Sequence, residues 1–191
     1  MITQHAIYPV GMNANWRDPA TDKLDDNLKD WLLDRQSLTK RLIASSERFR
    51  VQVLGQQVTT CAPHEANEDI AVGEAVIARE VLLFCDEIPH VFARSLLPLR
   101  SLTGNQSELS RLGNESLGQV LFNHPDLKRK CIEVANFDAN VQFPTILKHF
   151  NLAATKWLWG RRSVFVIEQK PLMVAEVFLP NALAYEQVKV C

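Results

Sequence analysis

The chain of 191 residues is long enough to form one domain with a sizeable hydrophobic core. Its 47% hydrophobic and 23% charged residues are typical of an ordinary soluble globular protein. A formal net charge of -1 argues against a nucleic-acid-binding surface, and no apolar run approaches the length of a membrane span, so we expect neither nucleic acid nor membrane insertion.

Two helices are predicted near the N-terminus. The first is indicated by apolar residues at helical spacing: Leu24, Leu28, Trp31 and Leu32. Thr21 or Asp22 is available as its N-cap. Ser37 could cap a second short helix, whose apolar residues are Leu38, Leu42 and Ile43.

A strand and a hairpin are predicted next. Residues 49–53 alternate as one face of a half-buried strand would. Residues 76–85 form a second strand, which the acidic loop at Asp86 and Glu87 joins to a third at 91–98.

The second strand carries charge only at its centre, in Arg79 and Glu80. Alternation places Arg79 on one face with Ile77 and Val81, and Glu80 on the opposite face with Leu82. Two interpretations remain open: an enclosed polar pocket inside an apolar shell, and a mutual ion pair in the core.

Further along, apolar positions in residues 117–121 suit a helix that ends before Pro125. Thr145, placed before the apolar residues Ile146, Leu147 and Phe150, predicts a small helix. Residues 164–167 and 171–180 flank a turn and predict a second hairpin. The chain is therefore expected to be α+β, one domain spanning 1–191, with helices and an antiparallel β-sheet enclosing a buried ligand pocket.

Glu176 is the only charged residue in the last of these strands, and both faces of that strand are apolar. An ionised carboxylate there is costly unless a cation, a donor or a ligand compensates it. It is either a structural ion pair or a carboxylate that binds a ligand hydroxyl. The basic pair Arg161 and Arg162 is interpreted as a solvated strand start and is given less weight than Arg79.

Competing chemistries have little support in the sequence. The five histidines and four cysteines show no metal-ligand spacing, and no nucleophile elbow, phosphate loop or dinucleotide fingerprint occurs. No metal and no cofactor are therefore expected. The cysteines are expected to be free thiols, and the absence of a signal-peptide pattern predicts a cytoplasmic protein.

Four separated blocks of sequence resemble the chorismate pyruvate-lyase family. They are residues 30–41, residues 79–83, residues 112–122 and residues 158–180, which contain LWGRRS, KPL and EVFLP in the family's order. The resemblance runs from about Leu28 to Tyr185, and none of the blocks is a generic motif.

This resemblance implies a cofactor-free lyase, expected to be monomeric, that converts chorismate to 4-hydroxybenzoate and pyruvate, the first committed step of ubiquinone biosynthesis. It implies that Arg79 binds the ring carboxylate and that Glu176 binds the hydroxyl. It implies further that the backbone N–H groups of Leu38 and Leu117 assist Arg79, and that Arg94 is a second basic residue near the enolpyruvyl carboxylate.

The chain departs from the family pattern at several places. Leu38 replaces a methionine, which leaves the backbone donor intact, and Ala93 replaces a glycine, which puts the local loop geometry in doubt. Residues 131–157 are interpreted as a family-atypical insertion, a surface elaboration rather than a lid or partner contact.

A second function remains possible. The fold type is similar to the effector-sensing domain of certain bacterial transcription regulators, so a non-catalytic module that binds small aromatic acids is the alternative. Only some twenty residues precede the first predicted helix, which is too few for a winged-helix domain.

Overall fold

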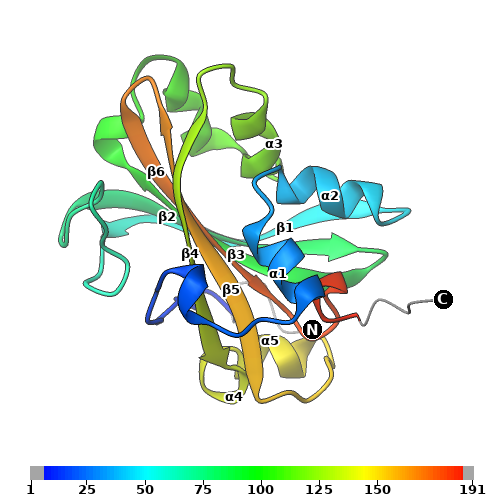
Figure 1. Ribbon diagram of the computed structural model, residues 1–191. Coiled ribbons are helices and arrows are strands. Elements are labelled where there is room, and N and C mark those ends of the chain that lie inside the picture. Colours follow the sequence, from blue (N-terminus) through cyan, green and yellow to red (C-terminus); the bar gives the residue numbers. More distant parts are fainter. Residues whose placement is uncertain (1–6, 187–191) are drawn as a thin grey trace.

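The computed structural model describes residues 7–186, and these form a six-stranded antiparallel sheet of order β1-β2-β3-β6-β5-β4. The strands are β1 (Phe49–Thr60), β2 (Ala75–Cys85), β3 (Ile88–Pro98), β4 (Lys128–Asp138), β5 (Trp157–Ile167) and β6 (Lys170–Phe178). β6 returns to lie beside β3, far earlier in the chain, in the middle of the sheet (Figure 1). The predicted α+β class is confirmed.

Two-residue turns make both predicted hairpins. Asp86 and Glu87 separate β2 from β3, and Glu168 and Gln169 separate β5 from β6. All four residues have φ between 48° and 68°, the left-handed conformation that matches a tight turn to the twist of its strands. Both hairpins were therefore placed correctly from the sequence.

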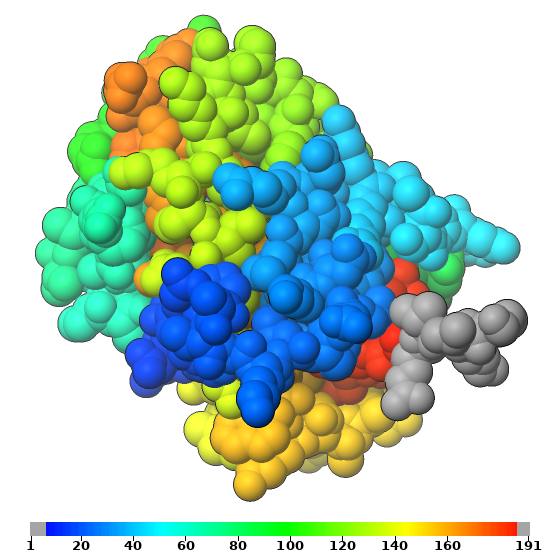
Figure 2. Space-filling model, viewed as in Figure 1, coloured from blue at the N-terminus to red at the C-terminus, as the bar shows by residue number. Residues whose placement is uncertain are grey.

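Helices cover both faces of the sheet. They are α1 (Asp26–Leu33), α2 (Leu38–Ala44), α3 (Leu117–Phe122), α4 (Ala139–Gln142) and α5 (Pro144–His149), with 3-10 turns at Pro19–Thr21, Leu99–Ser101, Gly104–Arg111 and Leu183–Tyr185. In Figure 1, α1, α2 and α3 lie over one face. Their apolar residues pack against residues on this face of the strands, such as Val81, Ala93 and Phe165. In Figure 2 the blue N-terminal segments and the yellow-green segment around α3 meet in front of the sheet and hide most of it.

The helix starts follow from local capping. Ser37 accepts a hydrogen bond from the Lys40 N–H at 3.3 Å and caps α2, as predicted. For α1 the predicted caps Thr21 and Asp22 are wrong, because Asp25 caps it by accepting from the Leu28 N–H at 2.8 Å. Asp22 is engaged elsewhere, since Arg17 Nε donates to it at 2.7 Å.

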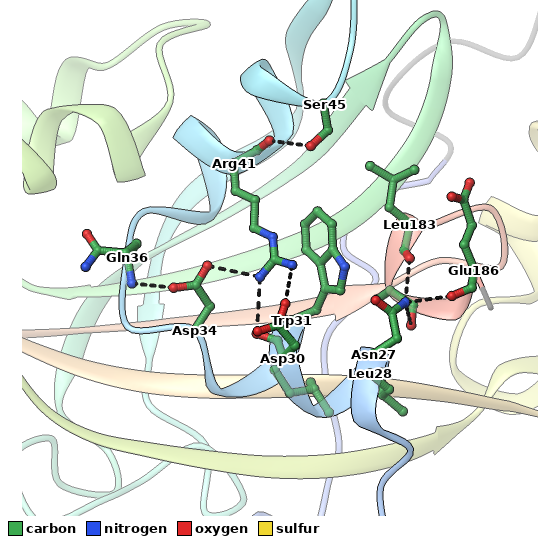
Figure 3. A network of polar contacts seen from close by, with 12 residues as sticks. Asn27, Leu28, Asp30, Trp31, Asp34, Gln36, Arg41, Ser45, Leu183 and Glu186 are labelled. Atoms are coloured by element: carbon green, nitrogen blue, oxygen red, sulfur yellow. Dashed lines mark hydrogen bonds and ion pairs between the residues drawn. The ribbon is translucent and has the colours of Figure 1, made fainter. Parts of the chain in front are cut away.

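A polar network joins α1, α2 and the C-terminal 3-10 turn (Figure 3). Arg41 of α2 donates to the Asp30 carboxylate at 2.6 Å and to the Asp34 carboxylate at 3.1 Å, and its guanidinium lies 3.7 Å from the Trp31 ring centroid. Asn27 donates to the carbonyl oxygen of Leu183 at 3.0 Å. The network fixes the loop at Asp34, which contacts the pocket described below.

The interpretation of residues 131–157 as a surface elaboration is wrong. Most of this segment's first third belongs to β4, an edge strand of the sheet. Phe137, Phe143 and Ile146 are buried, and the Phe143 ring lies 5.4 Å from that of Phe92 in the middle of the core. The predicted small helix is confirmed as α5, although it begins at Pro144 and not after a Thr145 cap. The segment therefore contributes several side chains to the core.

Gly160 allows β5 and β6 to approach beside Glu176. A Cβ atom at Gly160 would lie 2.8 Å from the Glu176 carbonyl oxygen and 3.0 Å from both Phe137 and Val177 side chains. Because the nearest atom is backbone, Gly160→Ala should lower the free energy of unfolding by about 1–3 kcal/mol in urea denaturation. Ser163→Ala is the control on the same strand, since the buried Ser163 hydroxyl has no partner among residues 7–186 to lose. Equal stability of both variants would contradict the close approach.

Candidate functional site

A pocket lies between the sheet and helices α2 and α3, and all six strands contribute to its lining. The lining residues with polar side chains or predicted roles are Leu38, Thr39, Arg79, Ser95, Glu115, Ser116, Leu117, Arg129, Arg161 and Glu176. The rest is mainly apolar, including Val81, Leu121 and Phe165. Four of the five residues predicted for the site, Leu38, Arg79, Leu117 and Glu176, are thus brought together, whereas Arg94 is not among them.

Arg79 is a buried cation with no anionic partner among the described residues. The residue is 3% exposed, and Nη2 donates to the carbonyl oxygens of Gly113 at 2.9 Å and Glu115 at 3.1 Å. Burial lowers the pKa of Arg79. A guanidinium in this state is prepared to bind an anion, because it has lost water without gaining a counter-charge.

Arg94 and Glu80 lie on the opposite face of the sheet. Glu80 is paired with Arg94 in the β2–β3 register, and Arg94 Nη1 donates to the Glu80 carboxylate at 2.8 Å. Glu65 accepts from the same guanidinium, and the N–H of Gly11 donates to Glu80 at 2.8 Å. The mutual Arg79–Glu80 pair is therefore absent, and Arg94, expected near the enolpyruvyl carboxylate, does not line the pocket that contains Arg79 and Glu176.

Glu176 is held by Arg161. These residues are cross-strand partners in β5 and β6, and Arg161 Nε donates to Glu176 Oε2 at 2.7 Å. Arg161 is 1% exposed, so its interpretation as a solvated strand start is wrong. Its Nη1 also donates to the carbonyl oxygens of Trp31 at 3.2 Å and Asp34 at 2.8 Å.

The ion-pair interpretation of Glu176 is confirmed, and one oxygen of its carboxylate remains available for a ligand. Oε2 takes part in a buried ion pair, while Oε1 has no hydrogen-bond partner within residues 7–186. Arg161 fixes the orientation of the carboxylate. The free oxygen can accept a hydrogen bond from a ligand hydroxyl.

The strand register sets the separation of Arg79 and Glu176. Arg79 pairs with Ser95 of β3, and Glu176 pairs with Ala93, two residues along the same strand. The two positions are thus offset by roughly 7 Å along the strands and about 10 Å across two strand spacings. Both side chains belong to the same face and line one pocket.

Leu38 and Leu117 are the first residues of α2 and α3. N–H groups in the first turn of a helix have no acceptor within that helix. The two helix starts are in contact, because the Thr39 and Ser116 hydroxyls are hydrogen-bonded at 2.7 Å. Gly118 permits this contact, since a Cβ there would lie 2.8 Å from Thr39 Oγ1.

Arg129 also lines the pocket and was missed in the sequence. A β-bulge between Arg129 and Cys131 breaks the alternation of β4 and opposes Arg129 to Phe165, on the pocket face. Without this bulge, simple alternation would place Arg129 on the other face. A lone arginine in a charged, irregular segment gave no other signal.

No group of three or more metal-ligating side chains is found within residues 7–186, and none of the helices there is long and apolar enough to cross a membrane. Cys61, Cys85 and Cys131 are free thiols, as expected, and Cys191 lies outside the described residues. Burial raises the pKa of Cys61 to about 11, with the nearby Glu65 and Glu74 carboxylates adding to the shift.

Solved structures share the fold. The C-terminal domain of the histidine utilization repressor from Pseudomonas syringae superposes with a TM-score of 0.55 at 13% identity, covering 74% of this chain and 96% of that one. The ligand-binding domain of a putative GntR-family transcriptional regulator from Bordetella bronchiseptica gives 0.54 at 15% identity, covering 75% and 91%. At these identities the likeness shows the fold alone, and it confirms the expected similarity to effector-sensing domains.

Sequence relatives are much closer. A probable chorismate pyruvate-lyase from Psychromonas ingrahamii is 38% identical over 180 residues, which cover 94% of this chain and 97% of that protein. A protein of the same name from Shewanella frigidimarina is 36% identical, covering 93% and 94%. The sequence profile of the family described as chorismate lyase matches residues 10–190. The chain therefore belongs to the chorismate lyase family of enzymes.

Proposed function

We propose that this protein cleaves chorismate to 4-hydroxybenzoate and pyruvate, as a cytoplasmic monomer at the first committed step towards ubiquinone. The observation that carries the proposal is the pairing of two incomplete polar groups in one pocket. Arg79 is a buried cation without an anion, and Glu176 Oε1 is a carboxylate oxygen without a donor, within the described residues. The ring carboxylate of chorismate supplies the anion for Arg79, and its ring hydroxyl supplies the donor for Glu176 Oε1.

The reaction requires no further reactant. The C3–O bond of the enolpyruvyl ether and the C4–H bond of the ring break, and the ring becomes aromatic. The hydrogen ends on the methylene carbon of the enolpyruvyl group, which leaves as pyruvate. Atoms and electrons balance within the substrate, so the protein contributes positioning and electrostatics.

Each side chain then has a defined task. The Arg79 fork binds the ring carboxylate, with the N–H groups of Leu38 and Leu117 as additional donors. Glu176 Oε1 accepts a hydrogen bond from the C4 hydroxyl and so orients the ring. Arg161 acts through Glu176, by holding Oε2 at 2.7 Å, and is a positioning residue. We assign no role at this pocket to Arg94, whose guanidinium is occupied by Glu65 and Glu80.

The test is turnover of chorismate by chelator-treated protein. We expect 4-hydroxybenzoate to appear by ultraviolet absorbance and pyruvate to appear in equal amount in a coupled assay, with the same rate before and after chelation. The alternative, a non-catalytic module, is favoured by the fold shared with a ligand-binding domain. Tight binding of 4-hydroxybenzoate with no release of pyruvate would support that alternative and exclude the lyase.

A further inference from the structure

Arg129 is the third arginine that lines the pocket, after Arg79 and Arg161. Neither the lyase nor the non-catalytic binding module described above gives it a role. The bulge in β4 directs it to the pocket face opposite Phe165, next to Phe122 of α3. Its guanidinium lies 5.4 Å from the Phe122 ring centroid and 4.8 Å from that of Phe165. These two aromatic rings contact the guanidinium and help to hold it in place.

The hydrogen bonding of Arg129 is incomplete. Nη1 donates to the Asp34 carbonyl oxygen at 3.0 Å, while Nε is buried and has no partner within residues 7–186. No carboxylate of the described residues forms an ion pair with it. Burial, with the adjacent Arg161 cation, lowers the pKa of Arg129 to about 10, so it stays charged at neutral pH.

The charges of the pocket do not balance. Arg79, Arg129 and Arg161 line it together with one largely buried carboxylate, Glu176, while Glu115 is exposed at its rim. Arg161 is neutralised by Glu176, which leaves two cations without an anion among the described residues. A ligand that carries two negative charges would complete the site, whereas a monocarboxylate would leave one arginine unpaired.

The location of Arg129 also fits the shape of such a ligand. The Asp34 carbonyl oxygen accepts from Arg129 at 3.0 Å and from Arg161 at 2.8 Å, so the two guanidinium groups are neighbours. Arg161 in turn holds Glu176. Arg129 therefore lies near Glu176, at the end of the pocket where the ligand hydroxyl is proposed to bind. In chorismate the enolpyruvyl ether is on the ring carbon next to the hydroxyl-bearing carbon, so its carboxylate lies at that same end.

We propose that Arg129 binds the second carboxylate of a dianionic substrate, the enolpyruvyl carboxylate of chorismate, and thereby distinguishes substrate from aromatic product. This inference rests on the proposed function and deepens it. After cleavage the second carboxylate belongs to pyruvate. 4-Hydroxybenzoate keeps its contacts with Arg79 and Glu176 and makes none with Arg129.

The experiment compares a monocarboxylate with a stable dicarboxylate by calorimetry. The probes are 4-hydroxybenzoate and 3-(carboxymethoxy)-4-hydroxybenzoate, whose second carboxylate is joined through an ether oxygen beside the hydroxyl. Arg129→Gln should weaken binding of the dicarboxylate roughly 10- to 100-fold, the loss of a hydrogen-bonded charge, and should leave 4-hydroxybenzoate affinity nearly unchanged. KM for chorismate should rise in parallel.

Two further variants serve as controls. Lys130→Gln removes a cation from the adjacent position, where Lys130 bonds to Asp69 at 2.7 Å outside the pocket, and should affect neither probe. Arg129→Lys keeps the charge without the planar fork, so it should give an intermediate loss for the dicarboxylate only. It also keeps the inference testable if Arg129→Gln does not fold.

Equal weakening of both probes, or of neither, in Arg129→Gln and Arg129→Lys would overturn the inference. The outcome is independent of turnover. If the protein fails to cleave chorismate but binds the dicarboxylate through Arg129, the proposed lyase activity is refuted. The proposed second anion site at Arg129 is then still supported. If Arg129→Gln cleaves chorismate with an unchanged KM, the proposed lyase activity is supported. Arg129 is then not part of the substrate site.

Discussion

Glu176→Gln should remove most of the turnover and also destabilise the fold. The substitution preserves volume but removes the charge that binds the ligand hydroxyl and balances Arg161. Losing a hydrogen bond to a charged group costs about 1.5–3 kcal/mol, which lowers kcat/KM by roughly 10- to 150-fold. Leaving Arg161, which is 1% exposed, without its anion should lower the free energy of unfolding by about 3 kcal/mol. Steady-state kinetics and urea denaturation measure the two effects separately.

The double variant Arg161→Gln with Glu176→Gln separates the structural role of Glu176 from its role in binding. It removes both charges, so part of the lost stability should return, although the carbonyl oxygens of Trp31 and Asp34 lose a donor. Activity should not return, because the ligand hydroxyl still has no carboxylate. Recovery of turnover together with stability would show that Glu176 is only the partner of Arg161.

Charged residues inside apolar strands were the strongest signal in the sequence. Glu176 and Arg79 each interrupt a run of apolar residues, and burial of a charge is too costly to occur without a compensating group. Alternation also placed Arg79 and Glu80 on opposite faces, which is correct. The sequence pattern alone therefore predicts two of the residues that line the pocket.

The partners of these charges could not be predicted in the same way. Arg161 binds Glu176 only because β5 and β6 pair in one particular register, and Glu80 binds Arg94 because of the register of β2 and β3. Periodicity within one strand contains no information on register between strands. The adjacent Arg161 and Arg162 resembled a solvated pair, yet both are buried once β4 covers the sheet edge.

The bulge in β4 caused the largest failure. It shifts the alternation at Lys130, so the pattern of β4 does not predict a strand and does not place Arg129 on the pocket face. The interpretation of residues 131–157 as a surface insertion had a separate origin, their departure from the family pattern. A bulge of this kind costs one unpaired residue and is common where a strand redirects a side chain towards a site. Here the irregularity that concealed the strand is also the feature that brings a third arginine into the pocket.

Arg79→Gln should weaken ligand binding strongly, as Glu176→Gln does, but without the loss of stability expected for Glu176→Gln. Arg79 has no anionic partner among the described residues, and burial alone lowers its pKa, so the charge is a cost to the folded protein. The carbonyl oxygens that it now contacts belong to Gly113 and Glu115, which are exposed and can bond to water instead. We therefore expect an unchanged or higher melting temperature, with affinity for 4-hydroxybenzoate reduced roughly 10- to 100-fold.

Two variants make this result specific to the guanidinium. Arg79→Lys keeps the charge but not the planar fork, so binding should weaken by less than in Arg79→Gln. Leu38→Met keeps the backbone donor and nearly the same volume, so it should leave both affinity and stability unchanged. Differential scanning calorimetry and titration with 4-hydroxybenzoate give the two quantities. If Arg79→Gln lost stability and affinity together, Arg79 would be a structural residue whose carbonyl contacts hold the loop before α3. If it gained stability and lost affinity, the buried charge would be kept for the ligand at the expense of the fold.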